Sequence, residues 1–127
     1  MKLNQERSNM TNKRLSLMML LIFTLIGCRK YYININTVSA NGVVSFQFYS
    51  HELDELNVDY IEVTNEINEP VWRISANDEP KKIAELTYGN IPEGFREIIK
   101  AKKLLKGKEY CILVVGSNFA GNASFVL

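Results

Sequence analysis

Imidazole groups, which can bind a metal ion or act as a base, are limited to one in this chain. The only histidine, His51, is followed by the carboxylates Glu52, Asp54 and Glu55. Imidazole and carboxylate groups together can hold a divalent cation. However, this stretch lacks the glycine and the spaced oxygen ligands of a calcium loop. We therefore interpret residues 51–55 as a solvated loop between strands and expect no metal site.

No motif of a catalytic centre is present either. The sequence contains no glycine-rich phosphate loop, no His-Glu-x-x-His motif and no nucleophile elbow. Any serine or threonine nucleophile would have to use His51 as its base, and nothing in the sequence marks such a partner. We predict that the protein is not an enzyme, with no cofactor and no small-molecule substrate.

The composition is that of one globular domain without a strong overall charge. The chain has 127 residues, with 15 Lys and Arg against 14 Asp and Glu. A length in this range is typical of a single domain. The formal charge of +1 provides no field to attract nucleic acid. With 46% hydrophobic residues, the composition also excludes a disordered acidic or basic tail.

The apolar residues are concentrated near the N-terminus. Residues 15–27 carry no charge and directly follow Lys13 and Arg14. A helix needs about 20 apolar residues to span a bilayer, so this stretch is too short. A short apolar segment after a basic flank is typical of a secretory signal. Both Met1 and Met10 precede it, and we favour Met10 as the start of translation.

The end of this segment, Leu25-Ile26-Gly27-Cys28, resembles a bacterial lipobox. The resemblance implies cleavage between Gly27 and Cys28 and acylation of Cys28, which would attach the protein to a lipid bilayer. Each methylene buried in the bilayer contributes ~0.8 kcal/mol, so two or more chains make a lasting anchor. Arg29 stands where an aspartate usually marks inner-membrane retention. The predicted location is thus the cell envelope, and the outer membrane facing the periplasm if the cell is Gram-negative.

These features divide the chain into three parts. We predict a signal peptide over 1–27, which forms a helix, a lipidated tether over 28–30, and one folded domain over 31–127. Cleavage would leave 100 residues, in which Cys111 has no intrachain partner when Cys28 is lipidated.

The folded part alternates apolar and polar residues with a period of two, which predicts β-strands. Asn41-Gly42 between two such runs predicts a hairpin turn. Residues 95–106 fit a helical face nearly as well as a strand, and we favour a short strand followed by an irregular segment. The predicted strands are 31–37, 44–49, 59–65, 71–75, 82–88, 96–101, 109–116 and 123–127.

The approach to the strand at 109–116 resembles the tyrosine corner of immunoglobulin-like and fibronectin type III domains. It contains Leu105, the turn residue Gly107 and then Tyr110 at the start of the strand. In such a corner the ring packs inward and the hydroxyl bonds to the backbone a few residues upstream. The resemblance implies an all-β, immunoglobulin-like antiparallel β-sandwich of about seven to eight strands. The alternative is a glycine turn before an unrelated strand.

Alternation along the central strands also predicts a partner surface. If Tyr110 and every second residue after it face the core, the apolar residues between them point outward. Exposed apolar rows of this kind often mark protein interfaces. The alternative is that residues 29–33 or 98–105 cover this row. The predicted surface residues are Tyr60, Glu62, Cys111, Leu113 and Val115.

Charges are segregated along the sequence. Nine acidic residues and one basic residue, Arg73, lie between Glu52 and Glu79, whereas eight basic residues and four acidic residues lie between Lys81 and Glu109. If the fold preserves these blocks, they would steer a partner of complementary charge.

The folded part is similar to small periplasmic immunity lipoproteins of type VI secretion. The matching pieces are Asn41-Gly42, Ile61-Glu62-Val63 with Val71-Trp72-Arg73, and Gly107-Lys108-Glu109-Tyr110. This resemblance implies that the protein binds and neutralises a secreted toxin. The alternative function is that of a structural or assembly lipoprotein of the envelope with no toxin partner.

Overall fold

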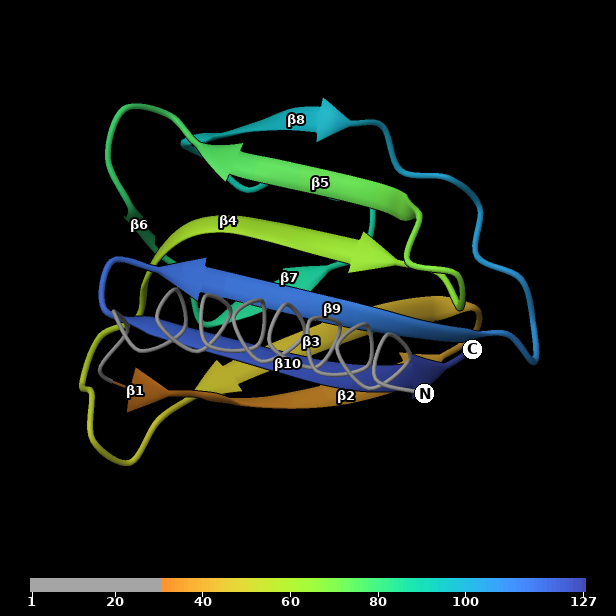
Figure 1. Cartoon of the computed structure of the whole chain (residues 1–127), viewed down its shortest axis with the longest axis horizontal. Coiled ribbons are helices and arrows are strands. Elements are labelled where there is room, and N and C mark those ends of the chain that lie inside the picture. The colour runs from red at the N-terminus through yellow and green to blue at the C-terminus, as the bar shows by residue number, and fades with distance from the viewer. Residues whose placement is uncertain (1–30) are drawn as a thin grey trace, which may run out of the picture. The chain divides into compact units, whose positions relative to one another are not determined.

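The structure, a computed structural model, describes residues 31–127, which form ten β-strands (Figure 1). The predicted signal peptide and the predicted lipidation site Cys28 lie outside the described residues. No helix in residues 31–127 is long and apolar enough to cross a lipid bilayer. The strands are β1 (Tyr31–Tyr32), β2 (Asn34–Ala40), β3 (Val43–Tyr49), β4 (Asn57–Thr64), β5 (Pro70–Ala76), β6 (Lys81–Lys82), β7 (Glu85–Thr87), β8 (Phe95–Ile99), β9 (Glu109–Gly116) and β10 (Phe119–Val126).

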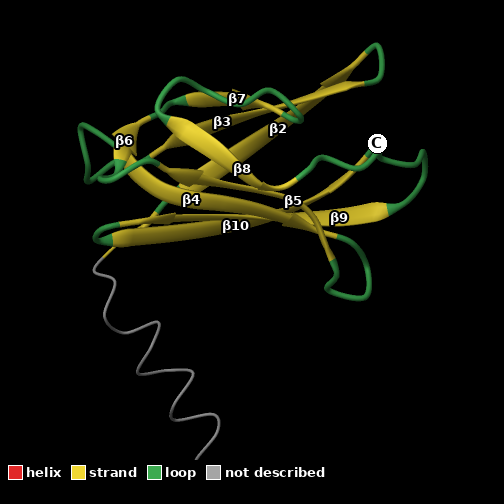
Figure 2. Cartoon of the chain, turned by 90° about the horizontal axis from the view of Figure 1, so that it is seen from above, coloured by secondary structure: helices red, strands yellow, loops and turns green. Residues whose placement is uncertain are grey.

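The strands form two sheets that face each other. A seven-stranded sheet has the order β1-β10-β9-β4-β5-β8, with β6 also paired to β4, and a three-stranded sheet has the order β2-β3-β7. Figure 2 shows β2, β3 and β7 in one layer and β4, β9 and β10 in the other. The predicted all-β class and the arrangement of two facing sheets are confirmed. The described residues contain ten strands where seven or eight were predicted, because two predicted strands are each divided in two.

The core lies between the sheets and is built by the predicted alternation. On β3, Val44, Phe46 and Phe48 are buried while the residues between them are half-buried or exposed. Trp72 on β5 is the largest fully buried side chain of the described residues. The Phe46 ring packs edge-on against Phe125 of β10, with centroids 5.2 Å apart, and so joins the two sheets. Burying side chains of this size stabilises the fold by about 1.5–3 kcal/mol each.

The predicted strand at 31–37 is in fact two strands in different sheets. Tyr31 and Tyr32 pair with the start of β10 in parallel, whereas Asn34 onward pairs with β3. The chain changes sheet at Ile33, whose side chain is buried and whose N–H donates to the carbonyl of Ala120 at 3.0 Å. Alternation continues through this residue, so the pattern alone could not reveal the crossing.

The predicted strand at 82–88 is divided in the same way. Lys81 and Lys82 pair with β4 in the larger sheet, and Glu85–Thr87 pairs with β3 in the smaller one. Ile83, between them, is buried, and its N–H donates to the carbonyl of Leu56 at 3.2 Å. A crossing between sheets therefore replaces one continuous strand.

The last hairpin is longer than predicted. The predicted strands leave residues 117–122 between them, but β10 begins at Phe119, and only Ser117 and Asn118 separate it from β9. The glycine at 121 does not mark a loop. A Cβ at Gly121 would lie 2.5 Å from the Ile33 side chain, so this glycine permits the close approach of the N-terminal segment to β10.

The Asn41-Gly42 turn is confirmed. Both residues have positive φ, 54° and 77°, which two-residue hairpin turns of this type require. Ala40 pairs with Val43 across it, so β2 and β3 form a regular hairpin.

The predicted irregular segment before β9 covers residues 100–108, because β8 ends two residues earlier than predicted. Side chains from elsewhere in the domain hold this segment in place. The Tyr88 hydroxyl donates to the carbonyl of Lys102 at 2.6 Å. The hydroxyl of Tyr110, whose ring is buried, accepts a hydrogen bond from the backbone N–H of Leu105 at 2.9 Å. This is the bond that the tyrosine-corner pattern predicts.

Candidate partner surface

Strand register brings the five predicted surface residues onto one face of the larger sheet. β4 lies between β9 and β5. Tyr60 pairs with Val115, and Glu62 pairs with Leu113. Cys111 lies two residues before Leu113 and therefore on the same face. The residues between them on β4 and β9 are buried in the core, so this face is directed away from the smaller sheet.

Four of these residues are partly exposed, and one is not. Tyr60, Glu62, Cys111 and Leu113 are half-buried. The expectation that Val115 is accessible was wrong, since only 4% of it is exposed. Val115 is nevertheless absent from the core cluster between the sheets. It lies on a central strand, directly between Tyr60 of β4 and Ala120 of β10, which explains why little of it reaches solvent.

The strand residues of the two proposed covering segments lie at the edges of the larger sheet. Residues 31–32 pair with β10 at one edge of the sheet, and residues 98–99 belong to β8 at the other edge. Residues 29 and 30 lie outside the described residues. Within the described chain, the row of Cys111 and Leu113 therefore stays partly open to solvent.

Arg73 on β5 is a central residue of this surface that the sequence analysis did not include. It pairs with Glu62 in the strand register, and its guanidinium group forms an ion pair with the Glu62 carboxylate. It also lies over the Tyr60 ring, 5.9 Å from the centroid. In the sequence, Arg73 is the only basic residue between Glu52 and Glu79, and this was the signal that could have identified it as a surface residue of interest.

Tyr60 and Arg73 also line a shallow hollow on this face. Ser75 and Ile98 complete its lining, and its volume is about 320 Å³. Ile98 is about half exposed. The surface therefore combines an aromatic ring, an ion pair and aliphatic side chains in a small area. We call this set, Tyr60, Glu62, Arg73, Ile98 and Leu113, the outer-face cluster.

The acidic and basic blocks of the sequence partly mix in the fold. Lys82 pairs with Glu55 at 3.3 Å, and Lys81 lies 4.0 Å from Glu79. The lysines of the segment 100–108 remain exposed, and no ion pair within residues 31–127 involves them. The basic half of the pattern thus persists on this segment.

The 51–55 stretch is an exposed loop between β3 and β4. The Ser50 hydroxyl accepts hydrogen bonds from the N–H groups of Glu52 and Leu53, and Glu55 pairs with Lys82. In residues 31–127, no three side chains of the metal-binding types lie close enough together to hold an ion. These bonds account for the local conformation of the loop.

Comparison with known proteins supplies no further assignment. The chain matches no protein-family model and no curated protein.

Proposed function

We propose that this protein is a lipid-anchored protein of the cell envelope that acts by binding another protein through its outer-face cluster. The observation that carries the proposal is the grouping of Tyr60, Arg73 and Glu62 beside the partly exposed Leu113. Tyrosine and arginine are enriched among the residues that dominate binding energy at protein interfaces. An ion pair at such a position adds specificity for a partner of matching charge.

The proposed anchor is the acylated Cys28. Only two residues separate Cys28 from Tyr31, the first residue of the domain. An extended chain spans at most about 3.6 Å per residue, so the domain would be held within ~11 Å of the acylated residue. This supports an envelope location in which the domain works close to a membrane.

We also propose that the sandwich is immunoglobulin-like. Two observations support this finer class. The bond from Leu105 to Tyr110 has the geometry of a tyrosine corner. In addition, β4, β9 and β10 are neighbours in one sheet and β2, β3 and β7 form the other. This arrangement matches strands C, F and G facing strands A, B and E of such domains.

The proposed partner is a toxin delivered into the periplasm, which the protein would neutralise by occupying part of its surface. The resemblance to immunity lipoproteins supports this choice, as do the anchor and the small size of the domain. The test is co-expression with secreted effectors encoded near the gene. Deleting the gene should sensitise cells to one effector, and full resistance to every effector would overturn the proposal.

Three variants make this test specific, two for the outer-face cluster and one for the proposed anchor. Tyr60→Ala should weaken protection, because it removes the ring over which Arg73 lies. Val38→Ala is a control, since Val38 is 45% exposed and belongs to β2 of the smaller sheet. Cys28→Ser should abolish acylation, which mass spectrometry of the envelope protein can read. A protein that keeps residues 1–27 and carries an unmodified Cys28 would contradict the proposed anchor.

The alternative function is structural, as a subunit of an envelope assembly. A stable stoichiometric complex with an envelope protein in a pull-down from membranes would favour it over toxin neutralisation.

A further inference from the structure

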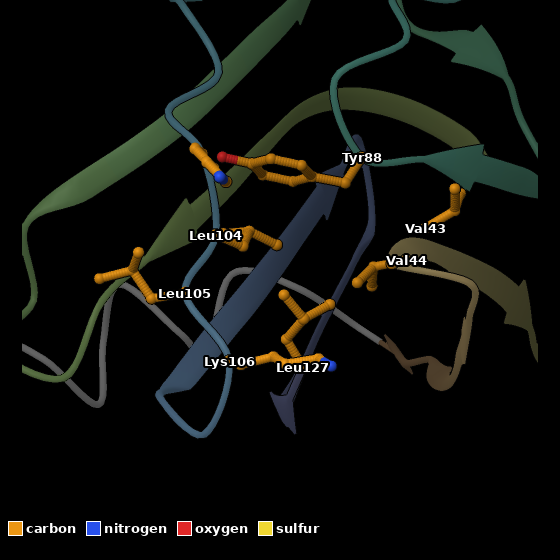
Figure 3. Close-up of a pocket in the computed structure, with 9 residues that line it drawn as sticks. Val43, Val44, Tyr88, Leu104, Leu105, Lys106 and Leu127 are labelled. Atoms are coloured by element: carbon orange, nitrogen blue, oxygen red, sulfur yellow. The ribbon is translucent and has the colours of Figure 1, made fainter.

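A groove of about 590 Å³ opens between the turn of the β2–β3 hairpin and the irregular segment 100–108 (Figure 3). Val44 and Leu104, which are buried, form its base. Val43 and Leu105, which are 51% and 54% exposed, lie on opposite walls. The volume is within the range of ~300–1,000 Å³ that is usual for ligand sites. The groove is separate from the outer-face cluster and shares no residue with it.

The wall formed by segment 100–108 is held by hydrogen bonds rather than by regular structure. Lys102 donates its N–H to the carbonyl of Val71 at 2.9 Å and accepts a bond from the Tyr88 hydroxyl. Gly107 donates its N–H to the carbonyl of Leu127, which also lines the groove, at 3.3 Å. A groove whose walls are already ordered loses little conformational entropy when it binds.

The charged side chains that line the groove are all basic. Lys103 and Lys106 line it, and both are exposed. Lys100, Lys102 and Lys108 lie beside them on the same segment, and no aspartate or glutamate lines the groove. Neither Lys103 nor Lys106 has an ion-pair partner within residues 31–127. An apolar base with lysines above it complements a ligand that is both apolar and acidic.

The position of the groove separates it from the proposed membrane anchor. Tyr31 lies at the start of β10, where its N–H donates to the carbonyl of Asn118. Leu127, which lines the groove, follows the other end of β10, and Figure 1 shows the C-terminus there, away from β1. A strand of eight residues, the length of β10, spans about 27 Å. The proposed anchor, three residues before Tyr31, therefore joins the domain at the end of β10 opposite the groove.

We propose that this groove binds an acidic segment of a protein partner, with a bulky apolar side chain of the partner seated between Val43 and Leu105. Carboxylates of the partner pair with Lys103 and Lys106. We choose a protein rather than a lipid surface as the partner because of the proposed anchor. The apolar and basic character of the groove is independent of that anchor. The groove thus adds a second contact, which shares no residue with the outer-face cluster.

The experiment measures binding of a fluorescein-labelled peptide to the full-length protein in a mild detergent by fluorescence anisotropy. The peptide is a run of aspartate and glutamate around one central tryptophan. Lys103→Glu combined with Lys106→Glu should weaken binding at least tenfold. Lys100→Glu combined with Lys108→Glu is the matched control, because it makes the same charge change on the same segment outside the groove. Leu105→Ser should weaken binding while the charges are unchanged.

Three outcomes would overturn the proposal. The first is an equal loss of affinity in the two lysine pairs, which indicates general attraction. The second is equal binding of a peptide whose tryptophan is replaced by serine. The third is binding of vesicles containing an anionic lipid, with the same dependence on Lys103 and Lys106, while the peptide does not bind. Tyr60→Ala should leave peptide binding unchanged, so this result is independent of the toxin-protection test.

Discussion

The hydroxyl of Tyr110, the second residue of β9, accepts a hydrogen bond from the backbone N–H of Leu105, five residues earlier in the chain, at 2.9 Å. The Tyr110 ring is buried and stacks on Phe125 of β10, with centroids 5.7 Å apart. One side chain therefore contributes to the core and also holds the irregular segment that carries the exposed lysines. Because Leu105 lies on the wall of the groove, this bond connects the stability of the sandwich to the shape of a candidate binding site.

Replacing Tyr110 with phenylalanine should lower the free energy of unfolding by about 1–3 kcal/mol. The ring remains in place, but the N–H of Leu105 loses its acceptor in a partly buried position. Urea unfolding followed by tryptophan fluorescence measures the change. Tyr32→Phe is the control, because Tyr32 is 66% exposed, and it should change stability by less than ~0.5 kcal/mol. Equal stability of Tyr110→Phe and the unmodified protein would contradict this role of the bond.

The phenol of Tyr88 should lose its proton at a higher pH than that of an exposed tyrosine. Burial of its phenol raises its pKa from 10.0 to about 12, and the nearby Tyr110 and Glu97 act in the same direction. Because the folded-state pKa is the higher one, the contribution of Tyr88 to stability is fully present below about pH 10. It is lost as the pH rises towards 12. The difference in tyrosinate absorbance between the unmodified protein and Tyr88→Phe isolates this group. A midpoint near 10 in that difference would contradict the prediction.

The ion pair between Glu62 and Arg73 should contribute modestly to stability. Arg73 is 41% exposed, so solvent screens the interaction, and we expect a coupling energy of about 0.5–1 kcal/mol. A double-mutant cycle of Glu62→Ala and Arg73→Ala, measured by urea unfolding, gives this energy. Added salt should reduce it. A coupling of several kcal/mol that does not respond to salt would show that the pair acts as a buried one.

Gly116, at the end of β9, should tolerate no side chain. A Cβ at this position would lie 2.2 Å from the Phe119 ring and 2.7 Å from the carbonyl oxygen of Asn57. Gly116→Ala should therefore cost about 1–3 kcal/mol of stability, as overpacking of a core does. Thermal unfolding measures the loss. Ser117→Ala, in the adjacent exposed turn, is the control and should change stability little.

Local patterns predicted which side chains face the core. Val44, Phe46 and Phe48 are buried as their alternation indicates, because a strand with one covered face must place every second residue there. The Asn41-Gly42 turn and the Tyr110 hydrogen bond were also predictable, since each depends on residues close together in the sequence.

Alternation does not reveal which sheet a strand joins. Ile33 and Ile83 are buried where the chain crosses between the sheets, and their apolar character continues the pattern of one strand. Gly121 lies inside β10 and admits the side chain of Ile33, a residue distant in the sequence. Such contacts become visible only when both segments are placed in space.

The sequence by itself determined the all-β class and the inward and outward faces of the strands. The signal peptide and lipobox at the N-terminus stay predictions. Only the tertiary structure decided that Arg73 joins Tyr60 and Glu62, and that Val115 is buried beside them. It also decided that Val43 and Leu105 line one groove, because sheet register and layer packing bring together residues that share no local pattern.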